Sequence, residues 1–398
     1  MAWASISEPK APPGKRTEAV SGVWGEGLAV KENKAKIRYA VVGLGHIAQV
    51  AVLPAFAHAS RNSALAALVS DNPKKLKQLS RLYGIGLTYS YEQYDDCLQS
   101  GEIDAVYIAL PNSMHADYAL RAANAGIHVL CEKPMAVTEK ECAAMIRATD
   151  KNHVKLMIAY RLHFEEANLK AVEVVRSGKL GEPRIFNSVF GMQVREGNIR
   201  IQAQLGGGTL YDLGIYCINA ARFLFQDEPL EAFAWSATNA DARFSEVDEM
   251  TSAVLRFPKD RLAVFTSSFG SADIASYQII GTRGDLRVDP AYEYAMELGH
   301  HLTIEGKTRS HTFAKRDQFA PELLYFSDCI ANDRKPEPSG EEGLADVRII
   351  RALYRSAQTG RPVKLQPTRV KKRPSLKQEK RRPPVAKPQL VNAESASV

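Results

Sequence analysis

Three polar side chains of this sequence, Lys133, Asp212 and Tyr216, form a set that could move a proton. Asp212 and Tyr216 are four positions apart and follow Gly206-Gly207-Gly208, so in a helix they would share one face. A phenol with an ordinary pKa of about 10 is a poor base near neutral pH unless a cation stabilises the phenolate. A lysine beside this tyrosine would supply that cation. Such a pair could take a proton from a hydroxyl group while hydride leaves the carbon.

Each part of this set also has a simpler explanation. Glu132-Lys133-Pro134 is a common tripeptide that alone would indicate a surface turn. An Asp and a Tyr on an otherwise apolar helix more often make buried hydrogen bonds than take part in catalysis. Position must decide between the two interpretations: the tripeptide ends an apolar run, and ligands of open α/β sheets bind at the carboxyl ends of the strands. Pro134 also restricts the backbone of Lys133 to extended conformations.

A glycine motif points independently to a nucleotide. Gly43-Leu44-Gly45-His46-Ile47-Ala48 has the form G-x-G-x-x-A and stands between an apolar run and a helical pattern. Its first Gly permits a tight turn, its second lets the backbone approach a pyrophosphate, and Ala48 allows close packing of helix on strand. Glycines after strands also occur in plain turns, so the context carries the prediction. We predict that this loop binds a dinucleotide.

The end of the second strand should distinguish NADP from NAD. An acid at this point accepts from the ribose 2′-hydroxyl of NAD, whereas a small polar residue with nearby cations suits a 2′-phosphate. Here Ser70 ends the apolar run, and Lys75 follows shortly after, which favours NADP. A shift of the strand end by one residue would place Asp71 at the ribose and favour NAD. We expect NADP, with NAD as the alternative.

The elements that position these residues follow two patterns. In 37–158, short and nearly continuous apolar runs alternate with helical patterns, which is typical of βαβ units. This region is predicted to be a Rossmann domain with a doubly wound parallel sheet covered on both faces. The expected strands are 37–43, 64–70, 104–110 and 127–132, with helices from His46, over 73–83 and from Ser113.

In 159–366 the strands become longer and their apolar residues alternate with polar ones, which indicates a sheet with one buried face. We predict an α+β domain with a large, open, mostly antiparallel sheet, so the fold class is α/β overall. The expected strands are 182–194, 231–240, 250–257, 262–270 and 276–282, and the expected helices are 164–177, 209–225, 317–332 and 340–358. The segments 193–205 and 291–319 are expected to be loops that line the pocket.

Two flanking segments differ from these domains. Residues 1–36 contain Pro9, Pro12 and Pro13 without sustained periodicity and are predicted to form an extended arm. Residues 367–398 hold 9 Lys and Arg against 2 Asp and Glu, so the net charge of +7 belongs to this tail. Its composition predicts disorder. Because the rest of the chain is neutral, nucleic acid is an improbable partner.

Five widely spaced cysteines and nine histidines show no metal-binding pattern, so no metal is expected. An odd number of cysteines without C-x-x-C also argues against a disulfide framework. The first residues have no apolar signal region, and no run reaches the roughly 18 apolar residues of a membrane span. We therefore expect a cytoplasmic protein that does not enter a membrane.

Five separated motifs together resemble the Gfo/Idh/MocA oxidoreductases, and within them the glucose-fructose oxidoreductase branch. They are the G-x-G-x-x-A loop, PNSMHADYALRAANAGIHVLCEKPMA (111–136), AYRLHFEEAN (159–168), GGGTLYDLGIYCIN (206–219) and PSGEEGLADVRIIRALYRSAQTGRPV (338–363). The wider family usually has a His where this chain has Tyr216, and the branch has Tyr. The segment before the glycine triplet, GNIRIQAQL, lacks the Trp-Arg pair usual in the branch.

This resemblance implies a role for each candidate residue. Tyr216 would be the catalytic acid and base, Lys133 its electrostatic activator, and Asp212 the acceptor that orients the sugar. The NADP contacts would come from Gly43, Leu44, Gly45, His46, Ile47, Ser70, Lys75, Leu110, Pro111, Asn112, His115, Glu132, Lys133 and Arg161. An ion pair of Arg161 with Glu165 or Glu166 is the plain alternative for that arginine.

The implied activity is hydride transfer between C1 of an aldose of the glucose or xylose type and NADP, with a possible return of hydride to a ketose. The implied assembly is a homodimer or homotetramer, formed through the C-terminal sheet and the N-terminal arm. A reductase of keto- or anhydro-sugars in the same family is the first alternative. A non-enzymatic regulator that senses nucleotide is the second.

Overall fold

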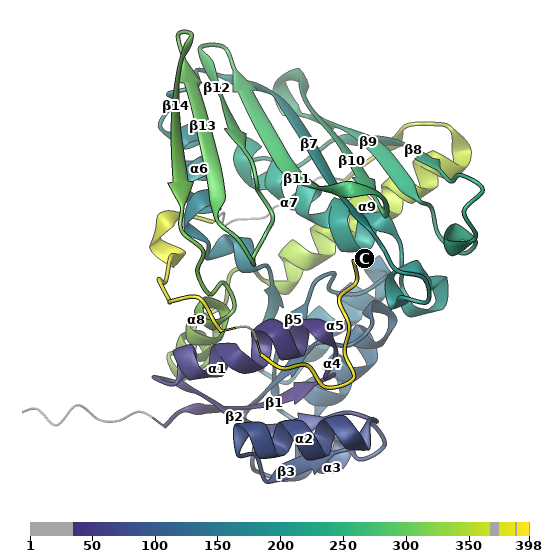
Figure 1. The fold of residues 1–398 in the computed structure, drawn as a ribbon, viewed down its shortest axis with the longest axis vertical. Coiled ribbons are helices and arrows are strands. Elements are labelled where there is room, and N and C mark those ends of the chain that lie inside the picture. Colours follow the sequence, from purple (N-terminus) through teal and green to yellow (C-terminus); the bar gives the residue numbers. More distant parts are fainter. Residues whose placement is uncertain (1–34, 367–373, 387, 398) are drawn as a thin grey trace, which may run out of the picture. The chain divides into compact units, whose positions relative to one another are not determined.

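The computed structural model describes residues 35–366, 374–386 and 388–397 (Figure 1). The predictions made for residues 1–34 and 367–373 lie outside these residues. Within them, the chain forms two sheets with different strand directions. The first sheet ends near Tyr160, and the second begins at Pro183.

The first sheet has six parallel strands in the order β3-β2-β1-β4-β5-β6. Its strands are β1 (Ile37–Val42), β2 (Ser63–Val69), β3 (Leu87–Tyr89), β4 (Ala105–Ile108), β5 (His128–Glu132) and β6 (Leu156–Ala159). The helices between them are α1 (Leu53–Ala59), α2 (Pro73–Tyr83), α3 (Tyr94–Gln99), α4 (His115–Asn124) and α5 (Glu139–Lys151). This is the doubly wound arrangement that the alternating pattern predicts.

Both faces of this sheet are buried, which explains why its strands are apolar throughout. Along β1, Ala40 and Val42 belong to one core, whereas Tyr39 and Val41 belong to another core on the opposite face. The helix ends are fixed locally. Asn72 accepts a hydrogen bond from the backbone of Lys75 and caps α2, an interaction that contributes typically about 1 kcal/mol.

The second sheet has nine strands in the order β14-β13-β12-β11-β7-β10-β9-β8-β15, and only β7 and β10 pair in parallel. Its long strands are β7 (Pro183–Gln193), β8 (Glu231–Ala237), β9 (Met250–Phe257), β10 (Arg261–Ser268) and β11 (Gly270–Gly281). Helices α6 (Glu166–Arg176), α7 (Ile215–Phe225) and α9 (Gly340–Thr359) lie on one face (Figure 1). Helix α8 (Ala320–Ala331) instead packs against α1.

One face of this second sheet is left without a helical layer among the described residues. Along β7, Phe186 and Phe190 are buried, whereas Ile185 and Val189 are exposed. Figure 1 shows the helices on the opposite side. The alternation read from the sequence therefore reflects a sheet with one buried face, and the predicted fold class is confirmed.

The structure corrects the expectation that 291–319 is a loop throughout. Most of this segment is a hairpin of β13 (Leu298–Ile304) and β14 (Lys307–Phe313), which extends the sheet beyond β12 (Gly284–Val288). Glu305 and Gly306 both have positive φ at its turn, as two-residue hairpin turns require. The hairpin escaped prediction because β14 is polar and exposed over most of its length. Strands β3, β6, β12 and β15 (Val363–Lys364) were also not predicted.

The C-terminal tail differs from its prediction as well. Residues 374–386 and 388–397 are extended segments that make hydrogen bonds with the rest of the protein, rather than the disordered chain that their composition predicts. Composition predicts disorder because these residues cannot bury a core of their own. Here they are held by groups of the folded domains instead.

Candidate active site

Lys133, Asp212 and Tyr216 meet although they come from different domains. Lys133 follows β5, and its Nζ donates to the backbone oxygen of Asp212 at 2.9 Å and lies 3.3 Å from the carboxylate Oδ1. The same Nζ lies 4.7 Å from the centre of the Tyr216 ring. Burial opposes the charge of Lys133, but Tyr216 and Asp212 outweigh burial and raise the pKa of the lysine. A cation is therefore held against the phenol.

Asp212 and Tyr216 lie at the start of the helix predicted over 209–225. The first turn, Leu210–Gly214, is a π-helix and continues into α7. Turns of this kind occur frequently at functional sites. Gly207 makes the entry to the turn possible, because a Cβ at that position would lie 2.4 Å from the Arg200 carbonyl oxygen. The glycine triplet thus allows two backbone segments to approach each other closely.

Arg200 is a site residue that the sequence analysis missed. Its Nε donates to Asp212 Oδ2 at 2.6 Å, so the carboxylate is shared between Arg200 and Lys133. Burial favours the neutral form of Asp212, but these two cations outweigh it and lower its pKa to about 2. The sequence segment GNIRIQAQL (197–205) contains Arg200. No recognised motif includes this arginine, because the Trp-Arg pair usual in the branch is absent from the segment.

Arg161 presents a second cation to Tyr216. It follows β6, and its Cζ lies 5.1 Å from the Tyr216 ring centre and 5.3 Å from that of Tyr294. Its guanidinium donates to the side chain of Gln318 and the backbone oxygen of Tyr292. The expected alternative, an ion pair with Glu165 or Glu166, is not what its hydrogen bonds show.

Those two acids have other roles. Glu165 accepts from the backbone N–H groups of Ala167 and Asn168 and so caps α6. Glu166 pairs with Arg316 at 2.6 Å. Since both acids bind other groups, Arg161 stays beside the Tyr216 ring.

A small cavity lies beside the tyrosine, whose ring packs against two further aromatic rings. The Tyr216 ring packs against Phe190 and Tyr292 at centroid distances of 5.5 and 5.8 Å. The residues around the cavity are Lys133, Tyr160, Leu162, Ile215, Tyr216 and Asn219. Ring packing of this kind limits the motion of the phenol.

A buried cluster of charges fixes the helix that carries Tyr216. Arg222 of α7 is fully buried and donates to Glu228, Glu342 and Asp346 at 2.6 to 2.9 Å. Asn219, one turn nearer to Tyr216, donates to the same two acids of α9. Buried charges paired in this way are costly to disrupt. The cluster therefore sets the register of α7 against α9.

The G-x-G-x-x-A loop has the shape of a nucleotide cradle. Gly43 has φ +92°, and a Cβ there would lie 2.5 Å from the backbone oxygen of Ala109, so only glycine fits. A Cβ at Gly45 would meet no atom within 4 Å. Gly45 thus faces open space where a pyrophosphate could approach the backbone. Before Gly45, Leu44 is buried, and after it His46 and Ile47 are half-buried.

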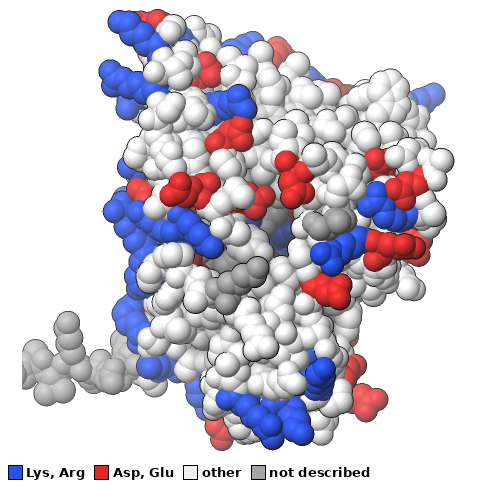
Figure 2. All heavy atoms as spheres, in the orientation of Figure 1, with Lys and Arg blue, Asp and Glu red and all other residues white. Residues whose placement is uncertain are grey.

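The far end of the predicted nucleotide site fits a 2′-phosphate. Ser70 directly follows β2, and the carboxylate of Asp71 accepts from the backbone N–H of Tyr91 at 2.7 Å. Asp71 is thus engaged by a loop, whereas α2 begins at Pro73 with Lys74 and Lys75 in its first turn. Figure 2 shows basic side chains gathered over α2. Cations and a helix N-terminus together favour phosphate.

The remaining residues predicted to contact the cofactor lie at or after the ends of strands β4 and β5. Asn112 donates to the Gly206 carbonyl at 2.8 Å and so links the two domains. The two ring nitrogens of His115 lie 2.8 and 2.9 Å from the carbonyl oxygens of Pro134 and Leu110. His115 therefore connects the segment after β4 to the segment after β5. Glu132 accepts from the Tyr107 hydroxyl at 2.8 Å, and Pro111 precedes the short helix that begins at Asn112.

A lysine and a tyrosine brought together at the carboxyl edge of a Rossmann sheet, in a chain that also carries a G-x-G-x-x-A loop, are typical of a nicotinamide-dependent oxidoreductase. The model of an oxidoreductase family with an NAD-binding Rossmann fold matches residues 37–160, and that of the GFO/IDH/MocA C-terminal domain matches residues 168–287. The chain therefore belongs to the GFO/IDH/MocA oxidoreductases. The resemblance drawn from the motifs is confirmed, and the protein is an enzyme rather than a non-enzymatic regulator.

Three relatives illustrate what this chain is similar to. D-xylose 1-dehydrogenase (NADP⁺) of Haloarcula marismortui is 31% identical over 340 residues, which cover 83% of this chain and 93% of the relative. The aldose-aldose oxidoreductase of Caulobacter crescentus, solved with glycerol, is 40% identical with a TM-score of 0.79, covering 83% of this chain and 100% of that one. A 3-ketoreductase of Actinomadura kijaniata, solved with NADP and TDP-benzene, is 26% identical with a TM-score of 0.74, covering 81% and 98%.

Other classes of site find no support in the described part of the chain. No group of three or more His, Cys, Asp or Glu side chains there could hold a metal ion. None of its helices is long and apolar enough to cross a membrane.

Proposed function

We propose that this enzyme oxidises an aldose at C1 to the lactone, with NADP as the hydride acceptor. The observation that carries the proposal is the position of Tyr216, between Lys133 and Arg161 and one helical turn from Asp212. One relative named above is an NADP-dependent D-xylose 1-dehydrogenase and another is an aldose-aldose oxidoreductase, which supports an aldose as the substrate class. Glucose and xylose are the first sugars to test.

The residues divide the chemistry as follows. Tyr216 accepts the proton of the C1 hydroxyl as the hydride leaves C1. Lys133 and Arg161 lie beside the ring of this tyrosine, so two positive charges are in place where negative charge develops during the transfer. Asp212 stays ionised between Arg200 and Lys133 and accepts a hydrogen bond from a sugar hydroxyl. NADP, when bound, supplies the carbon that receives the hydride.

The residues proposed to hold NADP are those that fit it in the structure. The Gly43–Ile47 loop would take the pyrophosphate, and Ser70 with Lys75 the 2′-phosphate. Leu110, Pro111, Asn112 and His115 would form the wall beside the nicotinamide half, with Glu132 and Arg161 at its end. NAD remains the alternative, and Asp71 is the residue that would favour it.

A keto-sugar reductase is the second candidate. The relatives include 3-ketoreductases, and a protonated Tyr216 beside Lys133 could equally donate a proton to a carbonyl oxygen. The two candidates differ in the direction of hydride flow and in the sugar.

The deciding experiment begins with the nucleotide that copurifies with the protein. Release of that nucleotide and mass spectrometry identify NADP or NAD, and the NADP-loaded enzyme is then tested with aldoses and keto-sugars. The proposal expects lactone and NADPH from glucose or xylose. Turnover of keto-sugars with NADPH and of no aldose would establish the alternative instead.

We also propose that the enzyme is a homodimer or homotetramer built on the uncovered face of the nine-stranded sheet. Large apolar side chains are exposed there, among them Ile185 and Val189 of β7 and Leu262 and Val264 of β10. Ile185 and Leu262 are direct neighbours in the register of the two strands. A contiguous exposed apolar surface of this kind is typical of a protein interface.

A cytoplasmic location is proposed as well. All five cysteines are buried and free, which suits a reducing compartment.

A further inference from the structure

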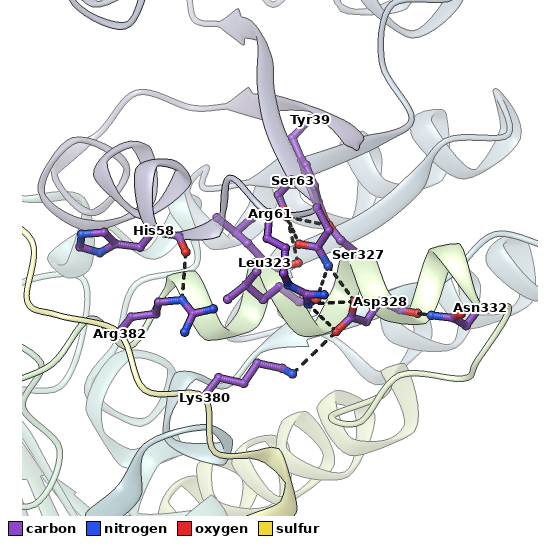
Figure 3. Close-up of polar contacts among 12 residues, drawn as sticks. Tyr39, His58, Arg61, Ser63, Leu323, Ser327, Asp328, Asn332, Lys380 and Arg382 are labelled. Atoms are coloured by element: carbon purple, nitrogen blue, oxygen red, sulfur yellow. Dashed lines mark hydrogen bonds and ion pairs between the residues drawn. The ribbon is translucent and has the colours of Figure 1, made fainter. Parts of the chain in front are cut away.

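The C-terminal residues 374–386 and 388–397 form an extended segment that we call the strap. Its first half lies along α8 and α6, where basic side chains are paired within the molecule. Lys380 Nζ lies 3.7 Å from Asp328, and Arg382 donates to the His58 carbonyl oxygen at 3.0 Å (Figure 3). Arg381 lies 3.0 Å from Glu166. The basic charge of this part of the tail thus serves to attach it.

The second half of the strap is attached to the nucleotide loop. Gln49 directly follows the G-x-G-x-x-A motif and is only 1% exposed. Its side chain donates to the carbonyl oxygen of Val391 at 2.9 Å and accepts from the N–H of Val391 at 2.8 Å. The same amide donates to the carbonyl of Leu44, inside the motif. Gln49 therefore joins the strap to the loop through a reciprocal pair of hydrogen bonds.

The end of the strap is attached to the other domain. Ser397 forms a bridge with Val194, and the N–H of Arg195 donates to the Ala396 carbonyl at 2.9 Å. Arg195 Nε donates to the Ser397 carbonyl at 2.7 Å. This attachment lies at the start of the segment that carries Arg200, and hence close in sequence to the residue that binds Asp212.

Between the two attachments the strap runs from the residue after the nucleotide loop to the segment that precedes Arg200. Val391 and Ala396 are five residue steps apart, so this stretch of chain can span at most roughly 17 Å. The first attachment adjoins the Gly43–Ile47 loop through Gln49 and Leu44. Burial and, after it, the charge of Arg200 lower the pKa of His46, so Arg200 lies near enough to that loop to affect it. Figure 1 shows the yellow strap passing from α1 towards the large sheet.

We propose that residues 388–397 close over the bound nucleotide and set the rate at which it enters and leaves. This proposal rests on the proposed function only because it requires NADP to bind at the Gly43–Ile47 loop. A covering segment that does not occupy the site slows entry and release together, so it changes both rates and leaves the dissociation constant nearly unchanged. A segment that occupied the site would instead slow entry alone and weaken binding.

Three variants test this. A chain that ends at Ala386 lacks the covering segment. Val391→Pro removes the N–H that Gln49 accepts, and Val391→Ala keeps that N–H and serves as the matched control. Thermal melting confirms that each variant is folded, and stopped-flow fluorescence gives the association and release rates of NADPH without any sugar.

We expect the association and release rates of NADPH both to rise more than about tenfold in the shortened chain. In Val391→Pro both rates should rise about fivefold, which is the effect of losing one net hydrogen bond. Val391→Ala should match the full chain. Equal rates in all four proteins would overturn the proposal, as would a faster association with an unchanged release rate. Binding of no nicotinamide nucleotide would overturn it together with the proposed function, whereas normal exchange without sugar oxidation would contradict the proposed function alone.

Discussion

At the scale of single residues, the account depends on Tyr216 as the group that moves the proton. Tyr216→Phe removes one hydroxyl and leaves the ring that packs against Phe190 and Tyr292. We expect kcat to fall roughly 10²- to 10⁴-fold, the usual effect of losing general acid–base catalysis, with nucleotide affinity unchanged. Steady-state kinetics and nucleotide titration measure both quantities.

Lys133→Met provides the test of how Tyr216 is activated. If the lysine acts through the phenol, the double variant should lose little more activity than Tyr216→Phe alone. Losses that multiply fully would contradict this activation. A Tyr216→Phe enzyme with nearly normal kcat and a stability lowered by about 1 to 3 kcal/mol would show that the hydroxyl is a structural group.

Asp212 should make the stability of the fold depend on acid pH. Its pKa of about 2 in the folded protein lies below the ordinary value of about 3.9, so the ionised group stabilises the fold above pH 4. This stabilisation, roughly 2 to 3 kcal/mol, is lost as the pH falls through 2. Urea unfolding of the parent and of Asp212→Asn at successive pH values should therefore show a difference in stability that shrinks with acid.

The control for that series is Asp241→Asn. Asp241 is bonded to Arg243 at the surface, and this bond lowers its pKa without burial. Solvent screens an exposed pair, so its removal should change stability little at any pH. A difference for Asp212→Asn that stays constant down to pH 2 would contradict the assigned charge state.

At the scale of elements, the two glycines of the nucleotide loop have separable roles. Gly45→Val should leave the free energy of unfolding nearly unchanged, because its side chain would enter open space, and should weaken NADP binding by at least about tenfold. Gly43→Ala should instead destabilise the fold by about 2 kcal/mol or more, since φ is positive and Ala109 blocks the Cβ. Denaturant unfolding and nucleotide titration separate the two effects. Normal NADP affinity in Gly45→Val would place the pyrophosphate elsewhere.

The elements also show how far sequence reasoning reaches. The parallel sheet and the long strands β7 to β11 could be predicted, because their apolar periodicity follows directly from the faces that they bury. The β13–β14 hairpin could not, since its residues are largely polar and its place in the sheet depends on a neighbour, β12. The same holds for the second half of the strap, because its partners Gln49 and Arg195 lie more than 200 residues away along the chain.

The site was predictable to the extent that motifs carry it. Lys133, Asp212 and Tyr216 belong to recognisable motifs, and they do lie together. Arg200 stands in a segment without one, and only the fold brings it to Asp212. Arg161 was predicted, but its hydrogen bonds to Gln318 and Tyr292 could not be, because they depend on residues 131 or more positions away.

At the scale of the whole molecule, the uncovered sheet face should determine the assembly. Ile185→Glu places a charge within the exposed apolar surface and should convert the proposed dimer or tetramer into smaller species. Leu82→Glu, on α2 outside this sheet, is the control for a charge added to an exposed leucine. Light scattering during size-exclusion chromatography gives the mass of each. A monomeric parent protein at micromolar concentration would contradict the proposed assembly.

The central claim is that this enzyme removes hydride from C1 of an aldose. Its most direct test is to mix the NADP-loaded enzyme with glucose or xylose that carries deuterium at C1 and to analyse the nucleotide by mass spectrometry. The account predicts that deuterium appears in NADPH, that its transfer is slower than that of hydrogen, and that Tyr216→Phe slows it further. An unlabelled NADPH, or no reduction with any aldose while keto-sugars are reduced by added NADPH, would contradict the account.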